Sequence, residues 1–278
     1  MNQIYSLLDA ILPFEWLGYD FMKNAFLAVL LLTPIFGILG TIIVNNRMAF
    51  FSDALGHGAF TGIAIGSVIG IFQPIWSAIV FSIGFSVLIT VIKNKTKSST
   101  DTVIGVFSSA AIALGVVLVT SGGNNKYTSF LVGDLLSISP GEVGILLILA
   151  VVIIVLWVMY YNKVLLVSVN ISLAKSRGIN TLAVELAFTS IIAVVVTVVI
   201  QWVGLLIINS LLVLPAAAAR NISANARHYN VIAILISIVS GLIGLILSYY
   251  MDTATGATIV IVSSIIYFIT LALRKRFA

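Results

Sequence analysis

The chain has 278 residues and a formal net charge of +5, with 61% hydrophobic and only 8% charged residues. Soluble domains carry about 25% charged residues, so this composition argues against a water-soluble enzyme and excludes a disordered or fibrous chain. With a mean hydropathy of +1.21, it predicts an all-α, polytopic membrane protein in the lipid bilayer. The absence of cysteine excludes disulfides, iron–sulfur clusters and cysteine-based zinc sites.

Residues 1–21 are expected to form an interfacial N-terminal segment. Acidic residues precede the first long apolar run and no basic stretch comes before it, so we expect that this segment is not a signal peptide. Aromatic side chains at headgroup level fit an interfacial position; they are Phe14, Trp16 and Tyr19.

Nine apolar runs follow, each near the length of about 20 residues that a spanning helix needs. In chain order they cover 22–44, 50–72, 75–92, 102–120, 142–161, 181–200, 202–219, 230–250 and 256–273. The sixth and seventh runs nearly touch and could form one broken pair around Gln201-Trp202, so the pattern predicts eight or nine spans in one transmembrane domain, 1–278. Between the runs, 126–140 is expected to be a short outer helix or re-entrant piece, and 163–180 a loop with a short helix.

The basic residues predict the orientation. With nine spans and the N-terminus outside, only Lys23 and Lys126 of the 14 Lys and Arg residues lie outside. Positive charge gathers in cytoplasmic loops, so we expect a cytoplasmic C-terminus in the cell membrane. In a membrane protein this charge indicates orientation and not binding to nucleic acid.

The sequence has no phosphate-binding G-x-x-x-x-G-K-[ST] loop, so we expect no ATPase site and no enzymatic activity in this chain. It also lacks a charge-rich voltage-sensor helix and a TVGYG-like filter. Active transport would therefore draw its energy from an ion gradient or from a separate subunit.

Three ionisable side chains within the apolar runs are candidate metal-site residues: Asp53, His57 and Glu185. Ionisable groups at this depth cost at least about 2.5–3.5 kcal/mol and usually face a protein interior or a water-filled pathway. Asp53 and His57 are four residues apart, so a helix places them on one face, with Thr61 next along the stripe. A carboxylate and an imidazole so placed either pair with each other or bind one metal ion.

The glycines of the same helix help to decide whether Asp53 and His57 only pair with each other or bind a metal ion. Gly58, Gly62, Gly66 and Gly70 recur at spacing four, which predicts a smooth ridge for close helix contact. A helix packed inside the bundle turns its polar stripe towards protein or a pathway, which favours the metal role. Glu185 lies near the cytoplasmic end of its span and suits either an interfacial carboxylate or a charged gate. For Asn209 a hydrogen bond between helices is favoured over metal ligation.

The segment from Arg47 to Gly62, with Asp53-Ala-Leu-Gly-His57, resembles the signature of the ATP-binding-cassette permeases for zinc, manganese and iron. Further similar pieces follow in the same order along nearly the whole chain. They include Gly133-Asp134, Val203-Gly-Leu-Leu and Leu212-Val-Leu-Pro215-Ala-Ala-Ala-Ala219. The chain departs from the family pattern at Asn170, where an acidic residue is common.

The resemblance implies a bundle like that of a type II importer, working as a homodimer with the pathway at its interface. It implies two copies of a cytoplasmic ATPase and an extracellular metal-binding lipoprotein as partners, with 163–180 as the cytoplasmic loop that docks on the ATPase. It also implies that Asp53 and His57 contact the transported ion. We expect no permanently bound cofactor, because the divalent metal is cargo.

Two other functions remain open at this stage. A proton- or sodium-coupled secondary carrier would use Asp53 and Glu185 as titrating sites and would need no ATPase. A structural or assembly protein would transport nothing. The sequence does not decide which metal is transported, since a His–Asp pair suits zinc and tolerates manganese and iron. The resemblance of the Met48-Ala-Phe-Phe part of the signature favours zinc slightly.

Overall fold

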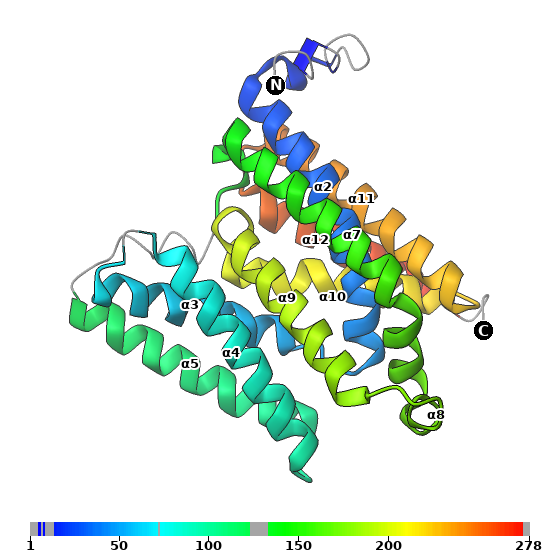
Figure 1. The fold of residues 1–278 in the computed structure, drawn as a ribbon. Helices are drawn as coiled ribbons and strands as arrows, with labels where there is room; N and C mark the ends of the chain where they lie inside the picture. The colour runs from blue at the N-terminus through cyan, green and yellow to red at the C-terminus, as the bar shows by residue number, and fades with distance from the viewer. Residues whose placement is uncertain (1–4, 7, 9–13, 72, 123–132, 275–278) are drawn as a thin grey trace. The chain divides into compact units, whose positions relative to one another are not determined.

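The computed structural model describes residues 5–6, 8, 14–71, 73–122 and 133–274. Nine helices of 18 residues or more are found there, and this part of the chain contains no strand (Figure 1). They are α2 (Asp20–Asn45), α3 (Phe51–Ile69), α4 (Pro74–Lys95), α5 (Thr100–Gly122), α7 (Pro140–Val169), α9 (Thr181–Val203), α10 (Leu205–Ile222), α11 (Ala226–Met251) and α12 (Thr255–Leu273). Three short helices are η1 (Glu15–Gly18), η3 (Leu135–Ser137) and α8 (Ile171–Ser176).

Each of the nine predicted runs coincides with one of these long helices, which confirms the all-α fold class. Among the described residues, seven helices are long and apolar enough to cross a membrane: α2, α4, α5, α7, α9, α11 and α12. An eighth, α10, is apolar but shorter. The ninth, α3, owes its lower hydropathy to Asp53, His57 and its glycines.

The segments between the runs are described only in part. Most of 1–13 and all of 123–132 lie outside the described residues, as do Lys126, Lys275 and Arg276, so their expected positions stay predictions. The predicted loop 163–180 is helical at its start, because α7 continues to Val169, and α8 supplies the expected short helix. Asn170 begins α8, where its side chain accepts a hydrogen bond of 2.9 Å from the Leu173 N–H. Aspartate caps helices equally well, which accounts for asparagine at this position.

The described chain divides into two compact units. The first holds residues 1–41, 134–154 and 210–278, and its helices approach closely at glycines. A Cβ atom on Gly244 would lie 2.6 Å from Ile259 Cα, where α11 packs on α12. A Cβ on Gly37 would lie 2.9 Å from the Ala233 carbonyl oxygen, where α2 meets α11. Small residues thus set the spacing of helices in this unit.

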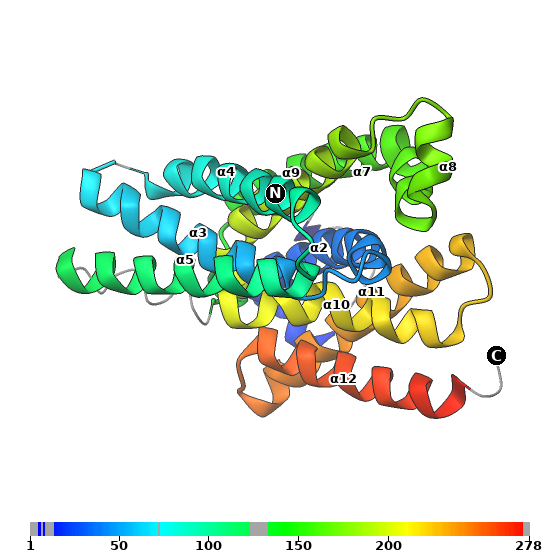
Figure 2. The same cartoon turned by 90° about the horizontal axis from the view of Figure 1, so that it is seen from below.

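The second unit holds residues 42–133 and 155–209, and α3 is its central helix. Helices α4, α5 and α9 all pack against α3, and α4 also packs against α5 and α9 (Figures 1 and 2). Within this unit the backbones at Gly133 and Gly204 nearly touch, since a Cβ on Gly133 would lie 2.3 Å from Gly204 N. Both glycines have positive φ, +72° and +87°, and Gly204 is the single residue that separates α9 from α10.

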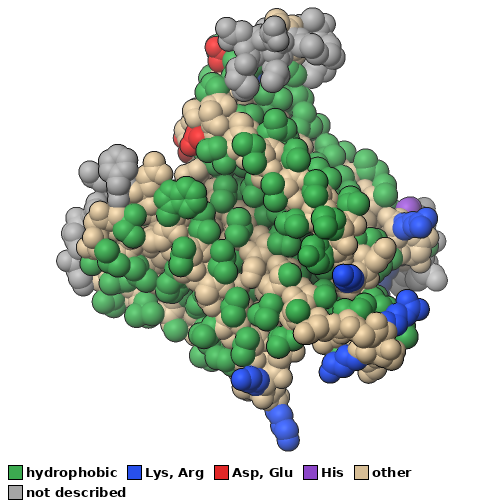
Figure 3. All heavy atoms as spheres, viewed as in Figure 1, with side chains coloured by type: hydrophobic (Ala, Val, Ile, Leu, Met, Phe, Trp, Pro, Cys, Tyr) green, Lys and Arg blue, Asp and Glu red, His purple; other side chains and the backbone are tan. Residues whose placement is uncertain are grey.

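Hydrophobic side chains cover most of the helix surface seen in Figure 3, with basic side chains near helix ends. On α7, Ile148 is 67% exposed and Val158 is 74% exposed. Such apolar exposure suits helices that face lipid, where the hydrocarbon chains complete the packing.

Candidate functional site

Helix α3 begins at a tight turn that anchors it to the helices around it. Arg47 has a positive φ of 54°, and Met48, one residue later, is fully buried. In the first turn of α3, the Ser52 hydroxyl donates a hydrogen bond of 2.5 Å to Asn209 Oδ1 on α10. This bond confirms the helix-to-helix role expected for Asn209 and fixes the start of α3 directly beside Asp53.

Asp53 and His57 share one face of α3, as the spacing predicts. His57 Nε2 lies 3.7 Å from Asp53 Oδ2, just beyond hydrogen-bond range. Among the described residues no hydrogen bond reaches either side chain, and the Asp53 and His57 side chains are 36% and 19% exposed. All the other residues of 51–64 are buried. The pair is therefore a narrow polar window in a stretch of α3, residues 51–64, that is otherwise buried.

The stripe ends at His57, because Thr61 is fully buried. The Thr61 hydroxyl donates to the Ala111 carbonyl oxygen on α5 at 2.6 Å and lies 3.0 Å from the His57 carbonyl oxygen. Gly115 of α5 sits against the same place, since a Cβ there would lie 3.0 Å from Thr61 Oγ1. Thr61 thus joins α3 to α5 and is not a further ligand position.

The glycine ridge is confirmed over three of its four members. A Cβ on Gly62 would lie 2.6 Å from Ala78 Cα on α4, and one on Gly66 would lie 2.0 Å from Ser77 Oγ. Gly58 lies against the Phe85 ring in the same way, at 2.9 Å. Gly70 has another role: it ends α3 with a φ of +81° and has open space around it. The ridge seats α3 on α4 and leaves the Asp53–His57 face free.

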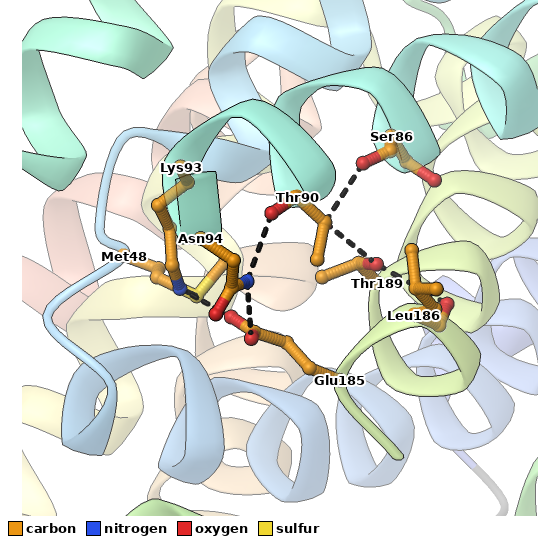
Figure 4. Close-up of polar contacts among 8 residues, drawn as sticks. All are labelled: Met48, Ser86, Thr90, Lys93, Asn94, Glu185, Leu186 and Thr189. Atoms are coloured by element: carbon orange, nitrogen blue, oxygen red, sulfur yellow. Dashed lines mark hydrogen bonds and ion pairs between the residues drawn. The ribbon is translucent and has the colours of Figure 1, made fainter. Parts of the chain in front are cut away.

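Glu185 belongs to a separate polar cluster, shown in Figure 4. Its carboxylate is paired with the Lys93 ammonium group and accepts a hydrogen bond of 2.9 Å from Asn94 Nδ2. Lys93 Nζ also lies 3.8 Å from Met48 Sδ, at the turn before α3. The carboxylate of α9 is thereby tied to the end of α4, and both partners are largely buried, with Lys93 18% and Glu185 15% exposed.

From the sequence, Lys93 follows the third apolar run, 75–92, on the expected cytoplasmic side, and nothing there predicted a pair with Glu185. No spacing signal links residues that lie 92 positions apart. The available signal was chemical: a carboxylate inside an apolar run needs a partner, and Lys93 ends a run at the same predicted side of the membrane.

The Asp53–His57 window can hold a cation only weakly on its own. No group of three His, Cys, Asp or Glu side chains with metal-binding geometry occurs among the described residues. Two ligands, one carboxylate oxygen and one imidazole nitrogen, leave most coordination positions to water or to groups from outside this chain. Such an open site suits an ion that arrives and leaves.

Comparisons with known proteins agree with this architecture. A protein-family model described as “ABC 3 transport family” matches residues 18–274. The chain is 34% identical over 247 residues to the high-affinity zinc uptake system membrane protein ZnuB of Buchnera aphidicola subsp. Baizongia pistaciae, covering 88% of this chain and 94% of ZnuB. It is 28% identical over 252 residues to the manganese transport system membrane protein MntC of Listeria monocytogenes, covering 90% of each. PsaBC from Streptococcus pneumoniae, solved in complex with Fab, has the same fold, with a TM-score of 0.80 at 23% identity over 97% of this chain and 95% of that one.

Proposed function

Because this chain belongs to the ABC 3 transport family, we propose that it is the membrane-spanning subunit of an ATP-driven importer for a divalent transition-metal ion. The names of its relatives favour zinc or manganese as cargo, with iron as a further candidate. Family membership favours ATP-driven transport over the proton- or sodium-coupled carrier. Hydrolysis would take place on a partner ATPase, since the chain has no phosphate-binding loop of its own.

The observation that carries this proposal is the Asp53–His57 window. Two chemically suitable ligands are the only residues of 51–64 that are not buried, and neither is used in hydrogen bonds within the described chain. Asp53 would supply an oxygen ligand and compensate the charge of the ion. Neutral His57 would supply a nitrogen ligand. Two ligands hold the ion without trapping it.

Glu185 would act differently from the window. Its carboxylate is already bound by Lys93 and Asn94. We assign it to a charged gate that supports the pathway, and direct contact with the ion would require this cluster to open.

The partners follow from the family and from α8. We propose a second copy of the chain, a cytoplasmic ATPase and an extracellular metal-binding lipoprotein. Helix α8 exposes Ile171 and Leu173, at 56% and 42%, beside the basic residues Lys175 and Arg177. An apolar pair with flanking charge suits docking on a protein, so α8 would contact the ATPase and the C-terminus would be cytoplasmic.

Metal uptake by cells tests this function. Asp53→Asn and His57→Ala should each lower uptake of zinc or manganese at least tenfold at normal membrane abundance. The control His228→Ala removes the other histidine, exposed at the start of α11, and should leave uptake unchanged. Full uptake in both window variants would overturn the assignment. Purification adds a second test, because the complex should contain an ATP-hydrolysing subunit.

A further inference from the structure

A cavity of about 310 Å³ lies in the second unit, away from the Asp53–His57 window. Its walls come from the α2–α3 turn, the ends of α4 and α7, and the starts of α5, α8 and α9. Helix α4 ends there with Lys93 and Lys95, and α8 contributes Lys175 close by in sequence. The positive-inside rule places this basic end at the cytoplasmic surface.

The charges on the wall leave one cation without a counter-ion. Arg47, Lys93 and Glu185 are the charged side chains that line the cavity. Lys93 and Glu185 neutralise each other. Arg47 is exposed, and no ion pair to its guanidinium group occurs within the described ranges. The cavity therefore carries a net charge of about +1 and favours a monovalent anion.

Neutral donors surround the same space. The oxygen of Ser168 is buried and has no hydrogen-bond partner among the described residues, which is costly unless a ligand or water supplies one. Thr100 is the first residue of α5, so its backbone N–H lies at the positive end of a 23-residue helix. Asn46 adds an amide. Guanidinium, hydroxyl and helix N–H donors together match the oxygens of a phosphate group.

Asn45 and Asn94 also line the cavity, but much of the remaining wall is apolar, and the helices beside it expose apolar side chains. Val164, Val167 and Phe188 line the cavity next to its polar groups. On α4 and α7, Leu88 and Met159 are 51% and 66% exposed. The polar groups of the cavity could therefore bind the phosphate head of a lipid, while its hydrocarbon chains would lie against the apolar side chains of α4 and α7. Basic pockets between transmembrane helices at the cytoplasmic side bind phospholipid head groups in this way.

We propose that this cavity binds the phosphate of an anionic phospholipid, with Arg47 as the charged contact and Ser168 and Thr100 as neutral donors. The same phosphate chemistry could come from a soluble phosphate ester, and the experiment separates the two sources. The proposal does not depend on which ion the window carries.

Native mass spectrometry of the full chain, freed of endogenous lipid in detergent, measures the binding. Dioleoyl phosphatidylglycerol is compared with dioleoyl phosphatidylcholine, and glycerol 1-phosphate is the soluble probe. Arg47→Asn removes the charge while keeping a residue that tolerates positive φ, and it should weaken phosphatidylglycerol binding about tenfold. Arg177→Asn removes a charge from the same end outside the cavity and should change binding little. Ser168→Ala should weaken binding a few-fold.

Selective binding of phosphatidylglycerol that Arg47→Asn loses and Arg177→Asn keeps would support the lipid site. Binding of glycerol 1-phosphate alone, with the same dependence on Arg47, would overturn the lipid source and assign a soluble phosphate. Equal losses in Arg47→Asn and Arg177→Asn would overturn the cavity, because surface charge would then explain the binding. Equal binding of phosphatidylglycerol and phosphatidylcholine would also overturn the proposed site, because a cavity with net positive charge should prefer the anionic lipid.

Discussion

Two polar pairs in the second unit differ in how their charge is satisfied. Lys93 and Glu185 come from different helices, contact directly, and gain a third partner in Asn94. Asp53 and His57 come from one helix, lie 3.7 Å apart, and have no hydrogen bond within the described chain. A satisfied buried pair mainly holds a fold together, whereas an unsatisfied pair at an opening is available to a ligand. We therefore expect the first pair, which also forms the proposed gate, to matter most for stability, and the second pair to matter for contact with the transported ion.

Breaking the Lys93–Glu185 pair should have the largest effect on stability. Lys93→Met leaves a largely buried carboxylate without its counter-ion, which in buried pairs costs about 3–5 kcal/mol. The double variant Lys93→Met with Glu185→Leu removes both charges and should recover most of that loss. Thermal unfolding in detergent measures both.

Variants of the Asp53–His57 window should behave in the opposite way, with stability kept and transport lost. Asp53→Asn and His57→Ala should unfold near the wild-type temperature although they transport poorly. The proposed division between the two pairs would be wrong if Asp53→Asn lowered stability as much as Lys93→Met does.

Adding a side chain to the glycine ridge of α3 should lower stability by less than the loss of the Lys93–Glu185 pair does. In Gly62→Ala the new Cβ would lie 2.6 Å from the backbone of α4 at Ala78, which cannot move aside as a flexible side chain can. We expect a loss of about 1–3 kcal/mol in unfolding free energy. Gly84→Ala on α4 is the matched control, since its Cβ meets nothing within 4 Å. It should gain up to about 1 kcal/mol from helix propensity. Equal responses of the two variants would show that the ridge does not set the α3–α4 contact.

Much of the fold could be predicted because its signals are local. Length and apolarity alone located nine helices, and the spacing of Gly58, Gly62 and Gly66 identified the face of α3 that packs. The i, i+4 spacing of Asp53 and His57 is also local, so the window could be predicted as a pair on one face.

The rest depends on contacts between residues that are distant in the chain. Thr61 continues the stripe by spacing, yet α5 covers it and takes its hydroxyl. Gly70 continues the ridge by spacing, yet the helix ends there. Glu185 could be identified as unusual, but its partner Lys93 lies on another helix, and helix periodicity carries no information on such pairing.

We expect the smallest loss of stability at Ser52, whose hydrogen bond anchors the start of α3 beside the Asp53–His57 window. Ser52→Ala removes the hydrogen bond to Asn209 and leaves a partly buried amide oxygen unpaired, which should cost about 1 kcal/mol of unfolding free energy. Because Ser52 immediately precedes Asp53, a looser helix start should also displace the carboxylate and lower uptake a few-fold at unchanged membrane abundance. Ser52→Thr keeps the hydroxyl and should retain more of the uptake. If Ser52→Ala lost stability but kept full uptake, the window would not depend on how α3 is anchored, and Asp53 would owe its position to the ridge alone.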